Sequence, residues 1–224
     1  IVLSGDPVTR QIITTTSFDV RGNALNQRIT KDAYTEGAYV IAEIQDIATL
    51  GYNIHDRASS STITSYESSD GITVIDTQAM NYLEYDRYGN VLQQTILTTA
   101  SDDKETFKVI TNTYDPTNKK SQMKGTPKTS ITMKYSRNAA GVDTLIEKTI
   151  TTIDTYDDRG NTVDRTSETL VADSTGALKL QKKISTHNDN IDARGDARFQ
   201  YITTSETDME GLKPEVTSYQ VIEN

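Results

Sequence analysis

A short corner motif recurs along this chain of 224 residues, and it constrains the fold more than any other feature. Three copies contain an aromatic residue, Asp, two variable residues, Gly and Asn, at Phe18–Asn23, Tyr85–Asn90 and Tyr156–Asn161. Four weaker copies lie at His55–Ser60, Tyr114–Lys119, Ile191–Asp196 and Tyr219–Asn224. The glycine positions, 22, 59, 89, 118, 160, 195 and 223, are 37, 30, 29, 42, 35 and 28 residues apart, a period of about 34. Such a period is typical of stacked supersecondary units.

The motif has a direct physical explanation as a hairpin turn. Asp at the first position of a type I turn accepts hydrogen bonds from backbone N–H groups. A three-residue hairpin loop then needs a residue in the left-handed conformation, which Gly adopts without steric cost. Asn118 is a good substitute for Gly at such a position, whereas Ser59 and Glu223 are poor ones.

A second series of turn-forming segments lies between the copies of the first. Asn138–Gly141, Asp173–Gly176 and Asp208–Gly211 have the same turn chemistry, and looser relatives end at Gly37, Gly71 and Lys104. Their spacings are 34, 33, 37, 35 and 35 residues. Two interleaved series predict that each repeat is two strands joined by two turns. We therefore expect residues 1–224 to form a single continuous array of about six β-hairpin repeats. This all-β antiparallel meander would curl into a spiral, a tube or a solenoid-like sheet, because flat sheets of so many strands are rare.

The composition supports an ordered β protein with a thin core. Thr, Ile, Val and Tyr number 35, 21, 12 and 12, and these β-branched and aromatic types suit a pleated surface. Only 34% of the residues are hydrophobic, against about 45–50% in an average domain. The strongest helical candidate, Ala38–Leu50, also alternates as a strand would.

Several classes of protein and site are excluded by composition. The net charge of −9 disfavours a nucleic-acid partner, and the absence of Cys excludes disulfides and thiolate chemistry. No run approaches the roughly 18 apolar residues that a membrane-spanning segment requires.

The corner sequences YDRYGN at Tyr85–Asn90, YDDRGN at Tyr156–Asn161 and FDVRGN at Phe18–Asn23 resemble those of YD-repeat, or Rhs-type, proteins. The resemblance implies a very large secreted or surface-borne bacterial protein in which hairpin repeats wind into a continuous sheet. Some members of that family enclose a toxin in a hollow cocoon. This chain is poor in aromatics, at 7% with no Trp, and carries no recognisable self-cleaving segment. These departures from the cocoon-forming members favour a wall, stalk or fibre built from the same repeats over a toxin-encapsulating cocoon.

The two ends of the chain fall at the same phase of the repeat. Thr16–Phe18 resembles Thr217–Tyr219, and Asn224 matches Asn23. A complete solenoid needs polar caps at its termini, and none is visible in this sequence. We therefore expect the sequence to be a window from a longer array.

Two segments near the C-terminus have alternative functional interpretations. His187–Asp192 presents oxygen ligands that suit Ca²⁺, although it lacks the glycine and glutamate of an EF-hand loop, and clustered Asp and Asn are also typical of solvated turns. Arg194–Asp196 matches the Arg-Gly-Asp cell-adhesion tripeptide, but it lies on a corner of the repeat, where Gly and a following Asn or Asp recur, and the turn is the stronger explanation. For His187–Asp192, Ca²⁺ binding and a solvated turn are therefore both open interpretations.

No combination of residues points to catalysis. His55 could act as a base for Ser59–Ser61, but it occupies the aromatic slot of a turn. The acidic pairs Asp102–Asp103 and Asp157–Asp158 are explained by turns. Lysines concentrate in the middle third, where they can protect strand edges or guide lateral packing, at 104, 108, 119, 120, 124, 128 and 134.

The favoured hypothesis is a structural or assembly module of a secreted bacterial protein, located outside the cell or on its surface. Its partners would be other copies or neighbouring repeats, with no nucleic acid and no membrane-spanning segment. The alternatives are a module for adhesion or cell-surface carbohydrate, and part of a toxin-enclosing cocoon. We expect no enzyme, and assign no catalytic, cofactor-binding or metal-ligating residue.

Overall fold

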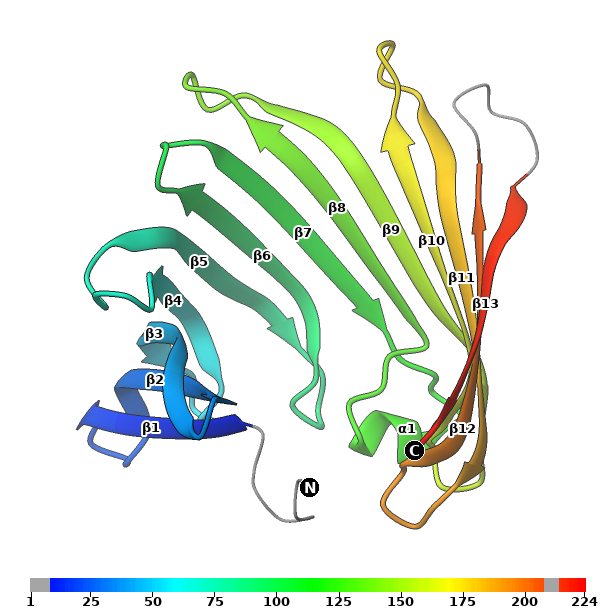
Figure 1. Ribbon diagram of the computed structural model, residues 1–224, viewed down its shortest axis with the longest axis horizontal. Coiled ribbons are helices and arrows are strands. Elements are labelled where there is room, and N and C mark those ends of the chain that lie inside the picture. Colours follow the sequence, from blue (N-terminus) through cyan, green and yellow to red (C-terminus); the bar gives the residue numbers. More distant parts are fainter. Residues whose placement is uncertain (1–8, 208–213) are drawn as a thin grey trace. The chain divides into compact units, whose positions relative to one another are not determined.

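The computed structural model describes residues 9–207 and 214–224, and these residues form thirteen strands and one short helix (Figure 1). The first seven strands are β1 (Thr9–Phe18), β2 (Ala24–Thr35), β3 (Ala38–Tyr52), β4 (Ala58–Tyr66), β5 (Val74–Tyr85), β6 (Val91–Ala100) and β7 (Glu105–Thr113). Helix α1 (Lys119–Met123) is followed by β8 (Thr129–Arg137), β9 (Asp143–Tyr156), β10 (Thr162–Ala172), β11 (Leu178–Ile191), β12 (Ala197–Glu206) and β13 (Glu215–Glu223). The expected all-β class is confirmed, and Ala38–Leu50 is a strand.

The strands form one sheet in chain order, from β1 at one edge to β13 at the other. Registers between neighbours are antiparallel, so the expected hairpin meander is confirmed. Connections from odd to even strands lie at one end of the strands, and connections from even to odd strands lie at the other. We call the first set corner turns (19–23, 53–57, 86–90, 157–161 and 192–196) and the second set opposite-end turns (36–37, 67–73, 101–104, 138–142 and 173–177).

The chain divides into two compact units. Unit 1 comprises the chain up to Tyr82 together with Ile96–Thr106, and unit 2 comprises Leu83–Thr95 and Phe107–Asn224. Each unit contains corner turns and opposite-end turns. The single continuous array of repeats stays a prediction.

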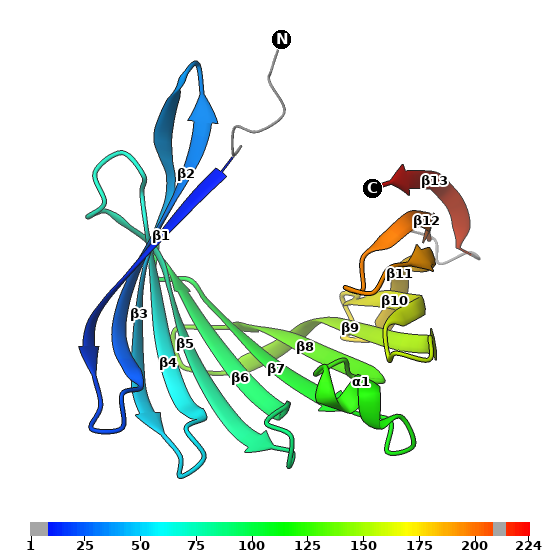
Figure 2. The same cartoon turned by 90° about the horizontal axis from the view of Figure 1, so that it is seen from below.

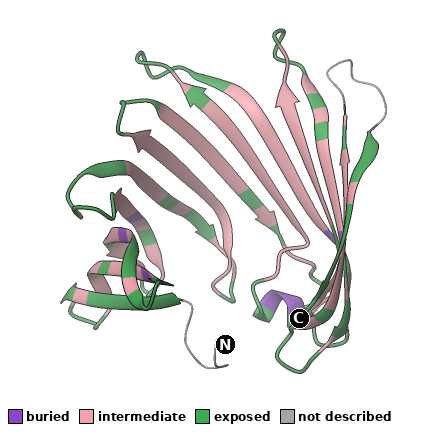
Figure 3. Cartoon of the chain, in the orientation of Figure 1, coloured by how far each residue is buried: buried purple, intermediate pink, exposed green. Residues whose placement is uncertain are grey.

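The core is as thin as the composition predicts. Among the described residues, Ile44 in unit 1 and Ile153 in unit 2 are the only buried hydrophobic side chains, and most strand residues are half-buried (Figure 3). The accessible surface is 14126 Å², whereas a folded monomer of 24.8 kDa normally exposes about 10,000 Å². Thr suits these half-exposed strands because it combines a β-branched shape with a hydroxyl.

Ion pairs join side chains that lie directly opposite each other on neighbouring strands. They include Arg10–Asp32, Lys31–Glu43 and Arg28–Asp46 in unit 1 and Lys183–Glu168 and Lys182–Glu206 in unit 2. Asp32 is buried, and Arg10 donates to its Oδ2 from Nε at 2.8 Å and from Nη2 at 2.5 Å. Such pairs compensate for part of the missing apolar core.

The corner expected at Ser59 lies three residues earlier. Asn53 takes the Asp position of the motif, and Asp56 takes the glycine position with a φ of 58°. Ser59 is inside β4. This correction makes the repeat more regular, since the separations of 37 and 30 residues become 34 and 33. The true motif was hidden because Asn and Asp replace Asp and Gly.

Two further corners differ from expectation. Asn118 does not adopt the left-handed conformation; with a φ of −103° it caps α1, and its side chain accepts a bond from Ser121 N–H. The connection from β7 to β8 is therefore a helical corner, residues 114–128 (Figure 2). Glu223 lies in β13 and not in a turn. A strand continues there because Asn224 N–H still pairs with Arg198.

The second series of turns is largely confirmed. Gly141 and Gly176 take positive φ angles and close five-residue loops that begin at Asn138 and Asp173. Glu36 and Gly37 form a two-residue turn in which both φ angles are positive, as a type I′ hairpin requires. In the loop at Lys104 the left-handed residue is Asp103. The turn expected at Asp208–Gly211 lies outside the described residues.

Candidate site: the corner turns

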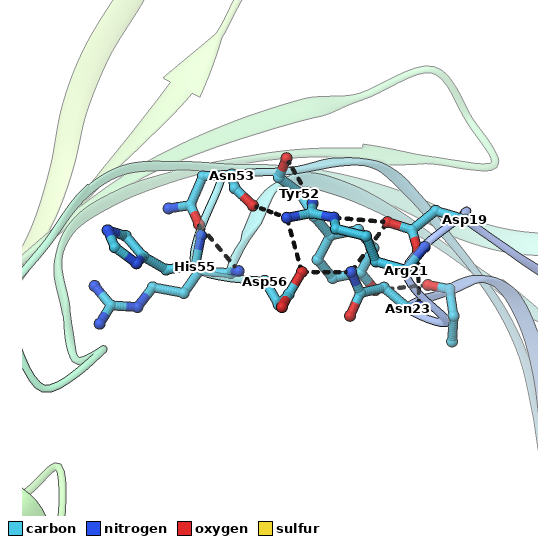
Figure 4. Close-up of polar contacts among 9 residues, drawn as sticks. Asp19, Arg21, Asn23, Tyr52, Asn53, His55 and Asp56 are labelled. Carbon is cyan, nitrogen blue, oxygen red and sulfur yellow. Dashed lines mark hydrogen bonds and ion pairs between the residues drawn. The ribbon is translucent and has the colours of Figure 1, made fainter.

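Each corner turn is a five-residue loop held by the side chain of its first residue. In the first corner, Gly22 N–H donates to Asp19 O at 3.1 Å and Asp19 N–H donates to Asn23 O at 2.8 Å. The Asp19 carboxylate accepts the N–H groups of Arg21 and Asn23, both at 2.8 Å, and the Asn23 side-chain amide at 3.0 Å (Figure 4). This is the predicted type I turn followed by a left-handed residue.

The same geometry recurs in the other corner turns. The side chains of Asn53, Asp86, Asp157 and Asp192 accept N–H bonds from residues two and four positions later. Gly22, Gly89, Gly160 and Gly195 all have φ between 79° and 98°. The local folding of these turns follows from the motif itself.

Hydrogen bonding lowers the pKa of several corner carboxylates. For Asp19 the largest cause is the side-chain amide of Asn23, and the pKa of Asp192 is lowered chiefly by the backbone N–H of Asp196. Burial alone would raise the pKa of Asp157, but bonds from Asn161 and Arg159 outweigh it and lower the pKa. These carboxylates are therefore stabilised as acceptors and not poised as general acids.

In unit 1, side chains of the first corner bond to the second corner. Arg21 donates to Asn53 O from Nη1 at 2.9 Å and also forms an ion pair with Asp56 Oδ1 at 2.9 Å (Figure 4). The Asn23 side-chain amide donates to Asp56 at 2.8 Å. We call these contacts forward bonds, because each donor lies on one corner and its acceptor lies on the next corner along the chain.

Forward bonds also join successive corners of unit 2. The Asn90 amide donates to Gln122 O at 2.7 Å, Lys120 donates to Asp158 O at 2.5 Å, and Lys124 contacts Asn161 Oδ1. Arg159 Nη2 donates at 2.5 Å to Ile191 O, at the end of β11 immediately before the corner turn 192–196, and we count this contact as a forward bond. Arg159 occupies the same position in its corner as Arg21 in the first, so the motif's second variable residue joins two hairpins.

A second set of contacts runs in the reverse direction. The carbonyl of the first residue after a corner accepts a bond from a side chain near the end of the following odd-numbered strand. We call these return bonds; the pairs are Tyr52 to Ala24 at 2.6 Å, Asn112 to Val91 at 2.9 Å, Asn188 to Thr162 at 3.0 Å and Asn224 to Ala197 at 3.0 Å. Forward and return bonds together couple successive hairpins within unit 1 and within unit 2.

The last corner turn, 192–196, borders a polar pocket of about 610 Å³. The pocket contains parts of both segments that the sequence singled out near the C-terminus. Its lining residues are Asn188, Asn190, Asp192, Arg194, Gly195, Asp196, Ala197, Arg198, Gln200 and Asn224. Asn190 has a φ of 54°, a conformation that few non-glycine residues adopt.

Two carboxylates near this pocket, Asp192 and Asp189, accept backbone N–H groups of residues close to them in the chain. Asp192 accepts three backbone N–H groups, and Asp189 accepts the backbone N–H of Asn190 at 2.8 Å. In residues 9–207 and 214–224, no group of three or more His, Cys, Asp or Glu side chains could hold a metal ion. The Ca²⁺ interpretation of His187–Asp192 receives no geometric support.

The two histidines lie in different settings. His55 is at the tip of a corner, where its backbone N–H donates to Asn53, and the Ser61 hydroxyl lies 3.4 Å from the hydroxyl of Thr49. His187 Nδ1 lies 2.7 Å from Asp164 on the neighbouring strand, and Thr155 also contacts that carboxylate. The Thr155 contact is the largest cause of a lowered pKa at Asp164. Neither histidine is joined to a serine nucleophile by a hydrogen bond among the described residues.

The other charged candidates are explained by turns. Asp102 forms an ion pair with Lys104 within an opposite-end turn, whereas Asp157 and Asp158 belong to a corner turn. Lys120 and Lys124 are donors of forward bonds, so they join hairpins and do not protect a strand edge. Sequence reasoning missed Arg21 and Arg159; Arg two residues after the corner Asp was the available signal, at Arg21, Arg159 and Arg194.

Comparisons with known proteins assign no family to the chain. No family model matches it, and no curated protein matches it. Among solved structures it is similar to the crystal structure of a protein with unknown function from Bacteroides fragilis NCTC 9343. The TM-score is 0.40 at 14% identity, covering 64% of this chain and 91% of that chain. Within the described residues, no helix is long and apolar enough to span a membrane.

Proposed function

We propose that this chain is a structural module of a large secreted bacterial protein of the YD-repeat, Rhs-like type, and that it builds an extracellular fibre, tube or shell. The observation that carries the proposal is the set of forward and return bonds between successive corners. These bonds act between hairpins and are not needed to close any single turn. A module that only needed to fold its own hairpins would not require them.

The composition of the joining side chains supports this role. Forward bonds are made by Arg, Lys and Asn, several of them exposed, and their acceptors are mostly backbone carbonyls of the next corner. A backbone acceptor is present whatever the side chain, so the device tolerates sequence variation between repeats. Because the core is thin, little apolar surface is buried between neighbouring hairpins, and the hydrophobic effect does little to hold them together.

Electron microscopy of the purified chain tests the proposal. Elongated or repeating assemblies are expected for the wild type, and the double variant Arg21→Ala/Arg159→Ala should shorten or disperse them. Arg165→Ala, in strand β10 and away from the corners, is the control that should assemble like the wild type. Discrete globular particles from the wild type at every concentration would count decisively against a structural role.

A further inference from the structure

Two tyrosine rings meet across the hairpin of β2 and β3 in unit 1. Tyr34 and Tyr39 are directly opposite each other in the strand register, and their ring centroids are 5.1 Å apart with 65° between the ring planes. This is the edge-to-face arrangement that aromatic pairs prefer. The two residues flank the turn at Glu36 and Gly37, so only a short loop separates them. The rings are therefore in contact whenever this hairpin is folded.

The surroundings hold one ring of the pair and expose the other. Tyr34 is 42% exposed, whereas Tyr39 is half-buried. The guanidinium carbon of Arg10 lies 4.6 Å from the centroid of the Tyr39 ring. Arg10 is fixed in turn by its two hydrogen bonds to the buried carboxylate of Asp32. A surface oxidant can thus reach Tyr34 while the ring of Tyr39 stays in place.

Tyrosine gives this chain a route to a covalent cross-link that its composition otherwise denies. The chain contains no Cys, which excludes disulfides, but it contains 12 Tyr. Two phenols can be coupled by oxidation, through a bond between the ring carbons that adjoin the hydroxyl groups. Two rings already in contact have a high effective concentration for this step, whereas rings on separate chains must first meet. The pair in the β2–β3 hairpin is suited to react within one chain.

We propose that Tyr34 and Tyr39 form an oxidative cross-linking site that yields dityrosine within the chain. The reagents are hydrogen peroxide and a haem peroxidase, which removes one electron and one proton from each phenol and leaves two tyrosyl radicals. A carbon–carbon bond then forms between the two ortho carbons. The hydrogen on each of these carbons moves to the phenolic oxygen, which restores both aromatic rings. The peroxide takes up the two electrons and two protons and leaves as two molecules of water.

The cross-link would fasten β2 to β3 beside an opposite-end turn. Forward and return bonds act at the corner end of the strands, so the dityrosine would be a covalent tie at the other end. It acts within one hairpin and requires no assembly of chains. The inference therefore goes beyond the proposed function and does not depend on it.

Intact-mass spectrometry of the full chain tests the inference. After treatment with hydrogen peroxide and a haem peroxidase, the monomer should lose the mass of two hydrogen atoms and gain dityrosine fluorescence. The yield should not change on about tenfold dilution, because a reaction within the chain does not depend on protein concentration. In tandem mass spectra of the peptide that contains both tyrosines, backbone fragments that end between residues 34 and 39 should be missing.

Variants of the chain locate the site. Tyr34→Phe and Tyr39→Phe each keep the ring and remove a phenol, and each should lower the yield within the chain about tenfold or more. Tyr135→Phe is the matched control, because the ring 6.1 Å from Tyr135 belongs to Phe107, which has no hydroxyl, so the yield should not change. Each variant loses one hydroxyl group, and its circular dichroism should stay that of the wild type.

Three results would each overturn the inference. They are a wild-type monomer that does not lose two hydrogen atoms, an undiminished yield in Tyr34→Phe or Tyr39→Phe, and cross-links that form only between chains and increase with concentration. Electron microscopy of the untreated chain tests the proposed function separately. Assembly without dityrosine removes only the inference, and dityrosine without assembly removes only the proposed function.

Discussion

Strand β10 begins and ends at turns with the same local chemistry but different surroundings. Asp157 starts the corner turn before it and Asp173 starts the opposite-end turn after it, with Gly160 and Gly176 as their left-handed residues. At the first turn, Arg159 donates to the carbonyl of Ile191, the residue immediately before the next corner turn. At the second turn, Asp173 forms an ion pair with Lys179 of the same hairpin.

This difference separates two roles that one motif combines. The Asx side chain and the left-handed glycine make a turn at either end of the strands. The side chains at the second variable position and at the final Asn of the corner motif join hairpins, and they do so at the corner end of the strands. In the described part of the chain, no side chain of one opposite-end turn bonds to the next such turn. Turn formation and hairpin coupling are therefore distinct properties that mutations can separate.

The largest contrast is expected between Gly160→Ala and Gly176→Ala. A Cβ at Gly160 would lie 2.6 Å from Ser121 N and 2.8 Å from the carbonyl carbon of Lys120, whereas nothing lies within 4 Å of a Cβ at Gly176. Both variants bear the cost of a left-handed alanine, about 1–2 kcal/mol. The backbone clash should raise the loss at Gly160 to about 3 kcal/mol or more. Urea unfolding measures both values, and equal losses would contradict a special role for the α1 contact.

A smaller effect is expected from Arg159→Ala. Loss of its bond to Ile191 O should lower the free energy of unfolding by about 1 kcal/mol. Arg194→Ala removes an Arg at the same corner position whose ion pairs, to Asp192 and Asp196, stay within its own turn and whose side chain is 82% exposed, so its effect should stay within about 0.5 kcal/mol. If the two variants were equally destabilising in urea, the forward bond would contribute nothing of its own.

The smallest loss of stability is expected on lowering the pH. It should come from protonation of carboxylates that close individual turns, and not from loss of the bonds between hairpins. The side-chain hydroxyl and backbone N–H of Thr175 lower the pKa of Asp173, so its carboxylate stabilises the turn at pH values above the unfolded-state pKa of about 3.9. That contribution is lost as the pH falls from there through the lower folded-state pKa. Asn138 makes equivalent bonds to Ala140 and Val142 without a titrating group.

Amide proton shifts recorded between pH 6 and pH 1.5 compare these two opposite-end turns. The N–H groups of Thr175 and Ala177, which donate to Asp173, should move as the carboxylate is protonated. Those of Ala140 and Val142 should stay constant. Parallel movement at both turns would indicate global unfolding and refute the local explanation.

The sequence predicts the turns far better than the contacts between them. Gly22, Gly89, Gly160 and Gly195 are identifiable because an Asp three residues earlier dictates the loop. Where Asn53 and Asp56 carry the same roles, the pattern of residue types no longer shows them. Asn118 illustrates a competition between local structures, since the residue that substitutes best for Gly in a turn is also a preferred N-cap.

The forward and return bonds depend on tertiary register. Arg21 and Asn53 are far apart in the sequence, and their contact follows from how β2 pairs with β3. Bulges also shift strand registers near the corners, for example between Thr49 and Gly51 in the pairing of β3 with β4. No local pattern states where such a shift occurs. The recurrence of Arg at the second variable position of the motif is the sequence feature that indicates this coupling between hairpins.

The strand order has a consequence for how the chain folds. Each strand of the described sheet pairs with its neighbours in the chain, so pairing requires only short loops to close. Contact order is then low for an all-β protein, and the entropic cost that usually slows β folding is reduced. A hairpin formed anywhere can template the next one, with the bonds between corners acting as the nearest-neighbour coupling of a one-dimensional array. Folding can thus propagate along the chain in steps of one hairpin.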